Sequence, residues 1–314
     1  EEAPELAIPR INLARAYLVQ RNLAGARTLL AEVIRVTEDF PEAEVLLANV
    51  ERGEGRASEA EARLRRVMEK EPSSLAHKSL GILLHEQGRR EEAAAEYRKA
   101  VEVDPEDPEG YNNLGTILEE QGRPEEAEAQ FRKAIEADPD YAGSYNNLAF
   151  LAMNRQDYEA AGPLLQEALE RSPKDPVIYN NRGNLFFHLG RLPEAEADFE
   201  KALALRSDYA EPHNGIGSIL GRRGDRTGEM REYRMALEIR PCYLDARLNL
   251  ARALVATGDL SEALKVCREG VALAPGDAGM WKLLGDDSLR AGTGTGPGKR
   301  NATRWREIPA SRRS

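Results

Sequence analysis

The fold is decided by residues 108–141, which read PEGYNNLGTILEEQGRPEEAEAQFRKAIEADPDY. Two amphipathic helical patterns flank a turn at Gln121-Gly122-Arg123. The residues that share one face of each pattern are Tyr111, Leu114, Gly115 and Leu118, then Ala127, Phe131 and Ala134. Pro139 cannot continue a helix, so it closes the unit. The stretch therefore predicts a helical hairpin of 34 residues.

The same hairpin recurs along the chain. Closing residues lie 34 residues apart at Pro105, Pro139, Pro173, Ser207, Pro241 and Pro275. A small residue recurs in each first helix, at Ala14, Ala48, Gly81, Gly115, Ala149, Gly183, Gly217, Ala251 and Gly285. A larger residue recurs in each second helix, at Leu30, Leu64, Tyr97, Phe131, Leu165, Phe199, Tyr233 and Cys267. We expect the small residues to admit close approach of the two helices and the large ones to fill the space between them.

A helix-turn-helix period of this length with these columns resembles the tetratricopeptide repeat family. The signature that matches is Tyr111, Leu114, Gly115, Leu118, Ala127, Phe131, Ala134 and Pro139. The resemblance implies an all-α fold, a right-handed superhelical α-solenoid of stacked hairpins, over residues 1–291. Its expected repeats are 7–40, 41–73, 74–107, 108–141, 142–175, 176–209, 210–243, 244–277 and a partial ninth at 278–291.

Composition fits a thin solenoid and excludes several classes of protein. Hydrophobic residues make up 41% of the chain and aromatic residues only 6%, as expected for helices packed through Ala and Leu. No run approaches the roughly 18 apolar residues of a membrane helix, so no membrane span is expected. The start, EEAPELAIPR, has no signal-peptide pattern, which favours a cytoplasmic location. It also lacks Met, so we expect a processed chain or an excerpt of a longer one.

Charge is distributed unevenly. The chain carries a net charge of −10, but residues 292–314 hold six basic residues against Glu307, a balance of +5 that leaves −15 for residues 1–291. An acidic array does not attract a phosphate backbone, so nucleic acid is not an expected partner. Gly and Pro punctuate residues 292–314, which predicts a basic disordered tail. The alternative is a basic arm that binds an acidic partner or a membrane surface.

Catalytic and metal-binding sets are not found in the sequence. His77, His85, His188 and His213 are scattered, and none has metal-ligand spacing to a cysteine or carboxylate. Cys267 occupies the large-residue column and should be buried, and no disulfide with Cys242 is expected. We therefore expect no enzyme activity, no cofactor and no metal.

The resemblance implies that the first helices line a concave inner surface where partners bind. The residues predicted to contact a partner there are Asn112, Asn113, Thr116, Asn146, Asn147, Phe150, Asn180, Asn181, Asn184, Phe187, Asn249 and Arg252. Stacked side-chain amides offer donors and an acceptor, so they can bind a peptide backbone whatever its sequence. The pattern is similar to the asparagine ladder of the tetratricopeptide arm in O-linked N-acetylglucosamine transferases. The alternative is structural, because Asn in the Asn113 column is common across the family.

A second binding mode of the family is disfavoured. Chaperone co-factors of this family hold a C-terminal carboxylate with Lys, Arg and Asn at fixed columns. The matching columns here hold Asn112, Thr116, Asn147, Val177 and Asn181, without the Lys and Arg.

These observations favour a non-catalytic scaffold that binds a protein or peptide, as a partner peptide or helix held in the concave groove. Two alternatives stay open: a tetratricopeptide arm of a larger enzyme, such as a glycosyltransferase or a sulfatase-like hydrolase, and a scaffold that self-associates through its ends. The Ala-, Arg- and Glu-rich repeats resemble those of bacterial proteins. Glu229 breaks the Ala column, which predicts a weak joint at 210–243: either Glu229 bends toward nearby arginines, or the second helix starts late, near Met230.

Overall fold

The computed structural model describes residues 7–37 and 40–285. Within these ranges it contains seventeen α-helices and no strand. The chain divides into two compact units, residues 1–155 (unit 1) and 156–314 (unit 2), which are described separately below. The predicted all-α fold of paired helices is confirmed. The boundary between the units falls inside the expected repeat 142–175.

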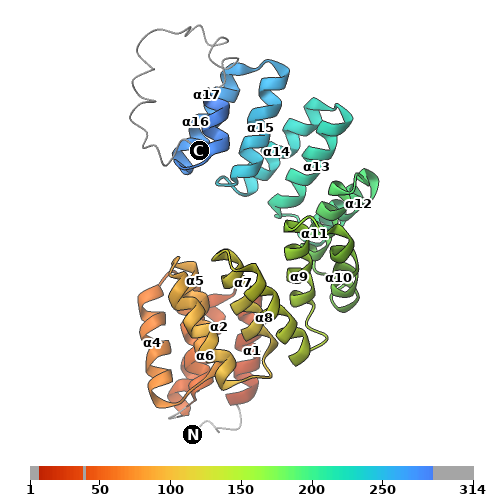
Figure 1. Ribbon diagram of the computed structural model, residues 1–314. Coiled ribbons are helices and arrows are strands. Elements are labelled where there is room, and N and C mark those ends of the chain that lie inside the picture. The colour runs from red at the N-terminus through yellow and green to blue at the C-terminus, as the bar shows by residue number, and fades with distance from the viewer. Residues whose placement is uncertain (1–6, 38–39, 286–314) are drawn as a thin grey trace. The chain divides into compact units, whose positions relative to one another are not determined.

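Unit 1 contains nine helices, of which the first eight pack as four consecutive antiparallel hairpins (Figure 1). They are α1 (Ala7–Val19), α2 (Leu23–Val36), α3 (Pro41–Gly53), α4 (Ala57–Lys70), α5 (Ser74–Glu86), α6 (Arg90–Val103), α7 (Pro108–Glu120), α8 (Pro124–Ala137) and α9 (Ala142–Asn154). Each second helix also packs against the first helix of the next hairpin, as α2 does against α3. The core therefore runs continuously through the unit.

Unit 2 repeats this arrangement with eight helices. They are α10 (Tyr158–Arg171), α11 (Pro176–His188), α12 (Leu192–Leu205), α13 (Ala210–Arg223), α14 (Arg226–Ile239), α15 (Leu244–Thr257), α16 (Leu260–Leu273) and α17 (Ala278–Gly285). The rest of the expected ninth repeat, 286–291, and the predicted basic tail, 292–314, lie outside the described residues.

The turn inside each hairpin needs one residue with positive φ. Glycine supplies it at Gly55, Gly88, Gly122, Gly190, Gly224 and Gly258. Arg21 and Gln156 hold the same position with φ of 56° and 60°. Glycine adopts this left-handed conformation without steric cost, which explains why it dominates the column.

The predicted small and large columns interlock in the core. A Cβ atom added to Gly81, Gly115, Gly183 or Gly217 would lie between 2.5 and 2.7 Å from a ring atom of the paired second helix. The rings belong to Tyr97, Phe131, Phe199 and Tyr233. Where the first helix has Ala instead, the second helix carries a smaller residue, at Leu30, Leu64, Leu165 and Cys267. Glycine therefore makes room for a ring, and alanine is matched to an aliphatic chain or a thiol.

In several repeats, the residue in the column of Tyr111 joins its hairpin to the one before it. Tyr145 and Tyr179 donate from their hydroxyls to the carbonyl oxygens of Pro139 and Pro173, at 3.0 and 3.2 Å. Trp281 donates from Nε1 to the Pro275 carbonyl at 2.8 Å. A polar tip on a large residue thus holds the closing turn of the preceding repeat.

Glu229 is accommodated within the array. Helix α14 begins at Arg226, so the expectation of a late start near Met230 is wrong. Glu229 is only 7% exposed, and its Oε2 lies 2.7 Å from Arg226 Nη1. The facing residue is Gly221, on which a Cβ would lie 2.5 Å from Glu229 Oε1. The carboxylate bends toward an arginine because glycine leaves space for it; whether the joint is weak stays a prediction.

The interlock between Gly115 and Phe131 can be tested by a double-mutant cycle. Gly115→Ala should lower the free energy of unfolding by about 1–3 kcal/mol, because its Cβ overpacks the ring. Adding Phe131→Leu should recover part of this loss, since Ala with Leu is the combination found at Ala48 and Leu64. Chemical denaturation of the full chain measures both effects. Strictly additive effects of the two substitutions would contradict the interlock.

Candidate functional site

The first-helix face of a unit is the surface formed by the first helices of its successive hairpins. In unit 1, the side-chain amide of one asparagine joins two neighbouring first helices. Asn112 on α7 is buried, and its Oδ1 accepts hydrogen bonds from Asn147 Nδ2 at 2.9 Å and from Ser144 Oγ at 3.2 Å, both on α9. Asn146 is also buried, and its Nδ2 lies 3.4 Å from Asn147 Oδ1. Asn112 therefore links adjacent first helices, and both buried amides leave little surface for a partner.

Three other predicted residues of unit 1 face outward. Asn113 is half-buried and makes no hydrogen bond within the described chain. Thr116 is half-buried and donates to the Asn112 carbonyl oxygen of its own helix at 3.1 Å. Phe150 is 43% exposed, which is unusual for so large an apolar side chain. The Asn113 amide therefore has hydrogen-bonding groups, and the Phe150 ring has apolar surface, that remain open to a partner.

Unit 2 contains the same amide link. Asn249 Nδ2 on α15 donates to Asn214 Oδ1 on α13 at 3.0 Å, with the 35-residue spacing of the Asn112–Asn147 pair. Asn180 on α11 is 4% exposed, but its Oδ1 has no hydrogen-bond partner. The residue 35 positions later is Gly215, which has no amide to donate. A Cβ there would lie 2.4 Å from Phe199 Cζ, so an aromatic ring takes the position.

The remaining predicted residues of unit 2 are half-buried or exposed. Asn181, Asn184 and Phe187 are half-buried, and Arg252 is exposed. Sequence reasoning did not single out Arg222, whose guanidinium lies 3.8 Å from the centroid of the Phe187 ring. Its Nη1 also donates to the Phe187 carbonyl oxygen at 3.2 Å. Phe187 and Arg222 are 35 residues apart, as Asn112 and Asn147 are, and this spacing is the feature of the sequence that could have indicated the contact.

That Phe187–Arg222 contact is one of a series between successive first helices. Equivalent positions in unit 1 pair Arg52 with Glu86, His85 with Glu120 and Asn154 with Glu119. The side chains differ but each pair joins the last turn of one first helix to the last turn of the next. Side-chain contacts therefore join the C-terminal ends of successive first helices in both units.

Buried polar pairs join first and second helices elsewhere. His213 Nδ1 lies 2.8 Å from Glu232 Oε2, and the hydrogen bond from His213 lowers the pKa of Glu232. Arg182 binds Asp198 through two nitrogens, at 2.7 and 2.8 Å, which fills the column where Leu or Ile is usual. Removing one partner of such a pair leaves a buried charge uncompensated, so we assign these residues to the fold.

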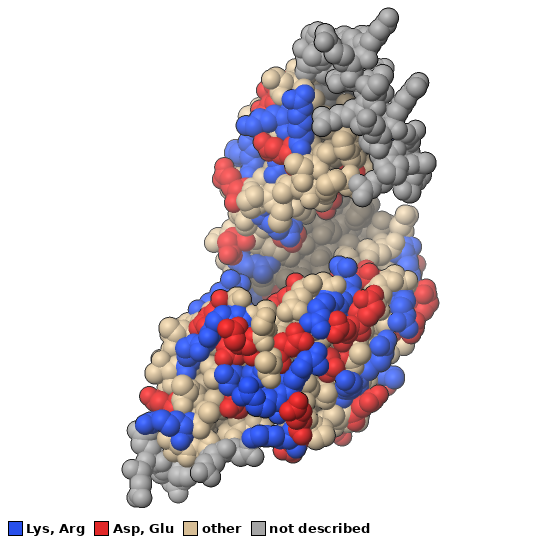
Figure 2. Space-filling model, turned by 90° about the vertical axis from the view of Figure 1, so that its left-hand side faces the viewer, with Lys and Arg blue, Asp and Glu red and all other residues tan. Residues whose placement is uncertain are grey.

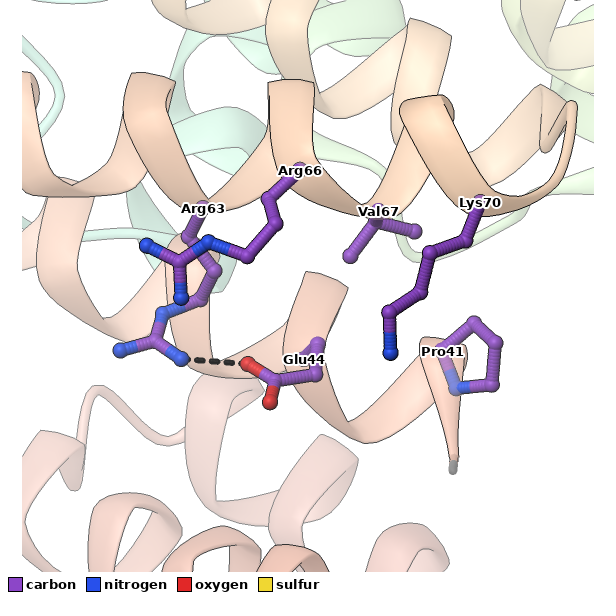
Figure 3. A pocket seen from close by; sticks show the side chains of 6 residues that line it. All are labelled: Pro41, Glu44, Arg63, Arg66, Val67 and Lys70. Carbon is purple, nitrogen blue, oxygen red and sulfur yellow. Dashed lines mark hydrogen bonds and ion pairs between the residues drawn. The ribbon is translucent and has the colours of Figure 1, made fainter. Parts of the chain in front are cut away.

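One surface pocket is small. It lies between α3 and α4 and is lined by Pro41, Glu44, Arg63, Arg66, Val67 and Lys70 (Figure 3). Arg63 binds Glu44 there and also Glu51, at 2.8 Å. Its volume of about 40 Å³ is close to that of one water molecule. A second pocket, of about 320 Å³, is lined by residues of α14, α15 and α16, among them Arg234, Arg247 and Glu269. The residues predicted to contact a partner lie on the first helices, so we take the first-helix faces as the candidate site.

Other classes of site are not indicated by the described residues. They contain no group of three or more His, Cys, Asp and Glu arranged to hold a metal ion. Cys267 is buried and Cys242 exposed, both as free thiols, and burial raises the pKa of Cys267 to about 11. None of the helices in ranges 7–37 and 40–285 combines the length and apolarity needed to span a membrane. Figure 2 shows Lys and Arg interspersed with Asp and Glu on the face it presents.

Stacked helical hairpins with a partly polar first-helix face define an α-helical repeat protein. Family profiles described as tetratricopeptide repeat match residues 11–74, 45–102, 78–142, 131–162, 176–209 and 230–286. Together they cover most of the chain. The chain belongs to the tetratricopeptide repeat family, whose members bind proteins or peptides.

Solved structures share this fold. The APC/C hetero-tetramer Cut9–Hcn1 matches with a TM-score of 0.73 and 15% identity, covering 87% of this chain and 54% of that one. A tetratricopeptide repeat protein from Parabacteroides merdae matches with a TM-score of 0.59 and 19% identity, covering 80% and 99%. Yeast Tom70 matches with a TM-score of 0.57 and 18% identity, covering 92% and 61%. This chain thus spans about half the length of the Cut9–Hcn1 chain. A comparison with curated proteins found no match.

Asn112 and Asn113 are adjacent in sequence but should respond differently to substitution. Asn112→Ala leaves two donors without their buried acceptor and should lower the free energy of unfolding by about 1–3 kcal/mol. Asn113→Ala breaks no hydrogen bond within the described chain and should leave stability nearly unchanged. Chemical denaturation of both variants provides the comparison. Equal losses would show that the two side chains share one structural role.

Proposed function

We propose that this protein is a non-catalytic scaffold that binds an extended peptide or a helix of a partner protein on its first-helix faces. The contacts would be made by side-chain amides and a few apolar groups. Membership of the family supports protein or peptide binding in general. The solved Cut9–Hcn1 hetero-tetramer is an example of a chain with this fold that assembles with a second protein.

The observation that carries the proposal is unused hydrogen-bonding capacity beside exposed apolar surface. In unit 1, the Asn113 amide has no partner within the described chain, and Phe150 is exposed on the neighbouring first helix. In unit 2, the Asn184 amide is likewise unpartnered among the described residues and lies three residues before Phe187. An amide that is half-open to solvent can exchange water for the N–H and C=O groups of a peptide. Asn113, Phe150, Asn184 and Phe187 are therefore the proposed contact residues in their respective units.

A photo-cross-linking experiment tests this proposal and identifies the partner at the same time. Benzoylphenylalanine placed at position 113 or 184 should capture a partner protein from cell extract, identified by mass spectrometry. The same group at Glu136, an exposed position on the second helix α8, should not capture it. Asn113→Ala and Asn184→Ala should each weaken binding of that partner by about 0.5–1.5 kcal/mol. Equal capture at position 136 would contradict a first-helix site.

Self-association is a second candidate function, and helix α1 favours it. Ile8, Leu13 and Val19 of α1 are 64%, 45% and 86% exposed. Pro9 and Ala16, on the same helix, are also exposed. The positions equivalent to Ala16 are buried in the other first helices described to that depth, at Val50, Leu83, Ile117, Leu151, Leu185, Ile219 and Ala253. A second copy of the chain could cover this apolar face as a neighbouring hairpin does elsewhere.

Light scattering across a dilution series tests self-association through α1. The wild-type mass should rise with concentration, and Ala16→Lys should abolish the rise because it places a charge in the apolar face. Ala62→Lys is the matched control, since Ala62 is an exposed alanine on α4. A monomeric wild-type protein at all concentrations, or the same effect from both substitutions, would exclude this face as the interface.

A further inference from the structure

Two arginines on the first-helix face of unit 2 carry charges that no carboxylate of the described chain neutralises. Arg222 stacks on Phe187 and donates to its carbonyl oxygen. Arg252 is exposed and makes no hydrogen bond or ion pair within the described chain. The arginines of unit 2 that do pair with a carboxylate are Arg171, Arg182, Arg191, Arg223, Arg226, Arg231, Arg234, Arg240 and Arg247. Arg206, which stacks on Tyr209, and Arg268, on the second helix α16, also lack a carboxylate partner among the described residues. Arg222 and Arg252 are therefore the unmatched arginines of the described first helices of unit 2.

Both arginines belong to one continuous face. On α13, Asn214, Ser218 and Arg222 recur every four residues, so they share a stripe. On α15, Asn249 and Arg252 are three residues apart and share another. The Asn214–Asn249 hydrogen bond joins the two stripes, and the Phe187–Arg222 stack joins α13 to α11. Helices α11, α13 and α15 follow one another through unit 2 with contacts between neighbours (Figure 1).

The carboxylates on these stripes lie at the opposite ends of the helices. Glu211, in the first turn of α13, is already paired with Arg240 at 2.8 Å. Asp245, in the first turn of α15, is seven residues from Arg252, or about 10 Å along the helix. The C-terminal part of the face is therefore cationic and the N-terminal part is not.

Aromatic side chains border the cationic part. His188 stacks on Tyr158 with ring centroids 5.5 Å apart, and it packs nearly perpendicular to Phe187 with ring centroids 6.0 Å apart. Leu189, the next residue, is 46% exposed. Rigid aromatic groups together with arginine are the residues that dominate binding energy at protein interfaces. The combination indicates a surface suited to a partner with both negative and apolar side chains.

We propose that Arg222 and Arg252 bind the side-chain carboxylates of an acidic, extended segment of a partner protein, with an apolar side chain of that segment against Phe187 and His188. Guanidinium groups bind carboxylates through paired, charge-assisted hydrogen bonds, and stacking on Phe187 already orients Arg222 for this. The proposal rests on the proposed scaffold function and names the chemistry of its partner in unit 2.

Charge balance favours an acidic peptide over a nucleic acid. Residues 156–285 contain 20 Asp and Glu against 17 Lys and Arg. A nucleic-acid backbone is bound through many phosphate contacts, each of which needs a cation. Two unmatched guanidinium groups on the first-helix face of a weakly acidic unit match a short segment with two carboxylates.

Fluorescence anisotropy with the full chain tests the proposal. The probe is a labelled twelve-residue peptide of glutamate and glycine with one central phenylalanine, and its control has glutamine in place of each glutamate. Arg222→Gln and Arg252→Gln should each weaken binding of the glutamate peptide by about fivefold. Arg268→Gln is the matched control, because Arg268 on the second helix α16 is exposed, has no partner among the described residues and should have no effect.

Several outcomes would overturn the proposal: no binding of the glutamate peptide, equal binding of the glutamine peptide, or an equal loss in Arg268→Gln. Tighter binding of a labelled oligothymidylate with the same arginine dependence would replace it with a nucleic-acid site. The scaffold function is judged separately by photo-cross-linking at positions 113 and 184. Capture there, with no preference for glutamate over glutamine, would leave the scaffold function standing and remove only the acidic partner.

Discussion

The close contact between a small residue on each first helix and a large residue on its second helix is the constraint on which the rest of the structure depends. It fixes how near the two helices lie, and the stacking of hairpins follows from that distance. Two combinations of residues make this contact in the chain. Glycine admits the rings of Tyr97, Phe131, Phe199 and Tyr233, and alanine is matched with smaller side chains. Each combination keeps the space between the helices filled, so a substitution on one helix requires a matching substitution on the other.

Once the helices are fixed, neighbouring residues on a first helix acquire different roles. Asn112 and Asn113 are separated by about 100° around the helix, because one turn takes 3.6 residues. Asn112 therefore points between α7 and α9, where it accepts two hydrogen bonds, and Asn113 keeps an open amide. The structural interpretation thus applies to Asn112, whereas peptide binding by Asn113 stays a proposal.

The 34-residue period predicted the fold, the helices and the core columns, because packing between helices imposes a strict spacing on apolar and small residues. The site was less predictable. Asn112, Asn146 and Asn180 were expected to contact a partner, yet all three are buried, and sequence spacing alone does not show how far a helix rotates toward its neighbour. Of the two alternatives for Glu229, the bend toward an arginine is the one observed. The sequence could not select it, because the space for the carboxylate comes from Gly221 on the facing helix, a contact in three dimensions.

Asn180 shows how one repeat can depart from the amide link without losing its packing. Gly215 removes the donor that Asn147 and Asn249 supply in their own repeats, and the acceptor oxygen of Asn180 is left unpaired. An unsatisfied buried acceptor costs about 1–3 kcal/mol. Burying a phenylalanine side chain contributes about 1.5–3 kcal/mol, and the Phe199 ring is fully buried against Gly215. The two magnitudes are comparable, so the array tolerates an exchange of polar for apolar contact here. The exchange also places Gly215 on α13 at the position where α9, α11 and α15 carry an asparagine. Ser218 and Arg222 are then the polar residues that follow on the first-helix face of α13.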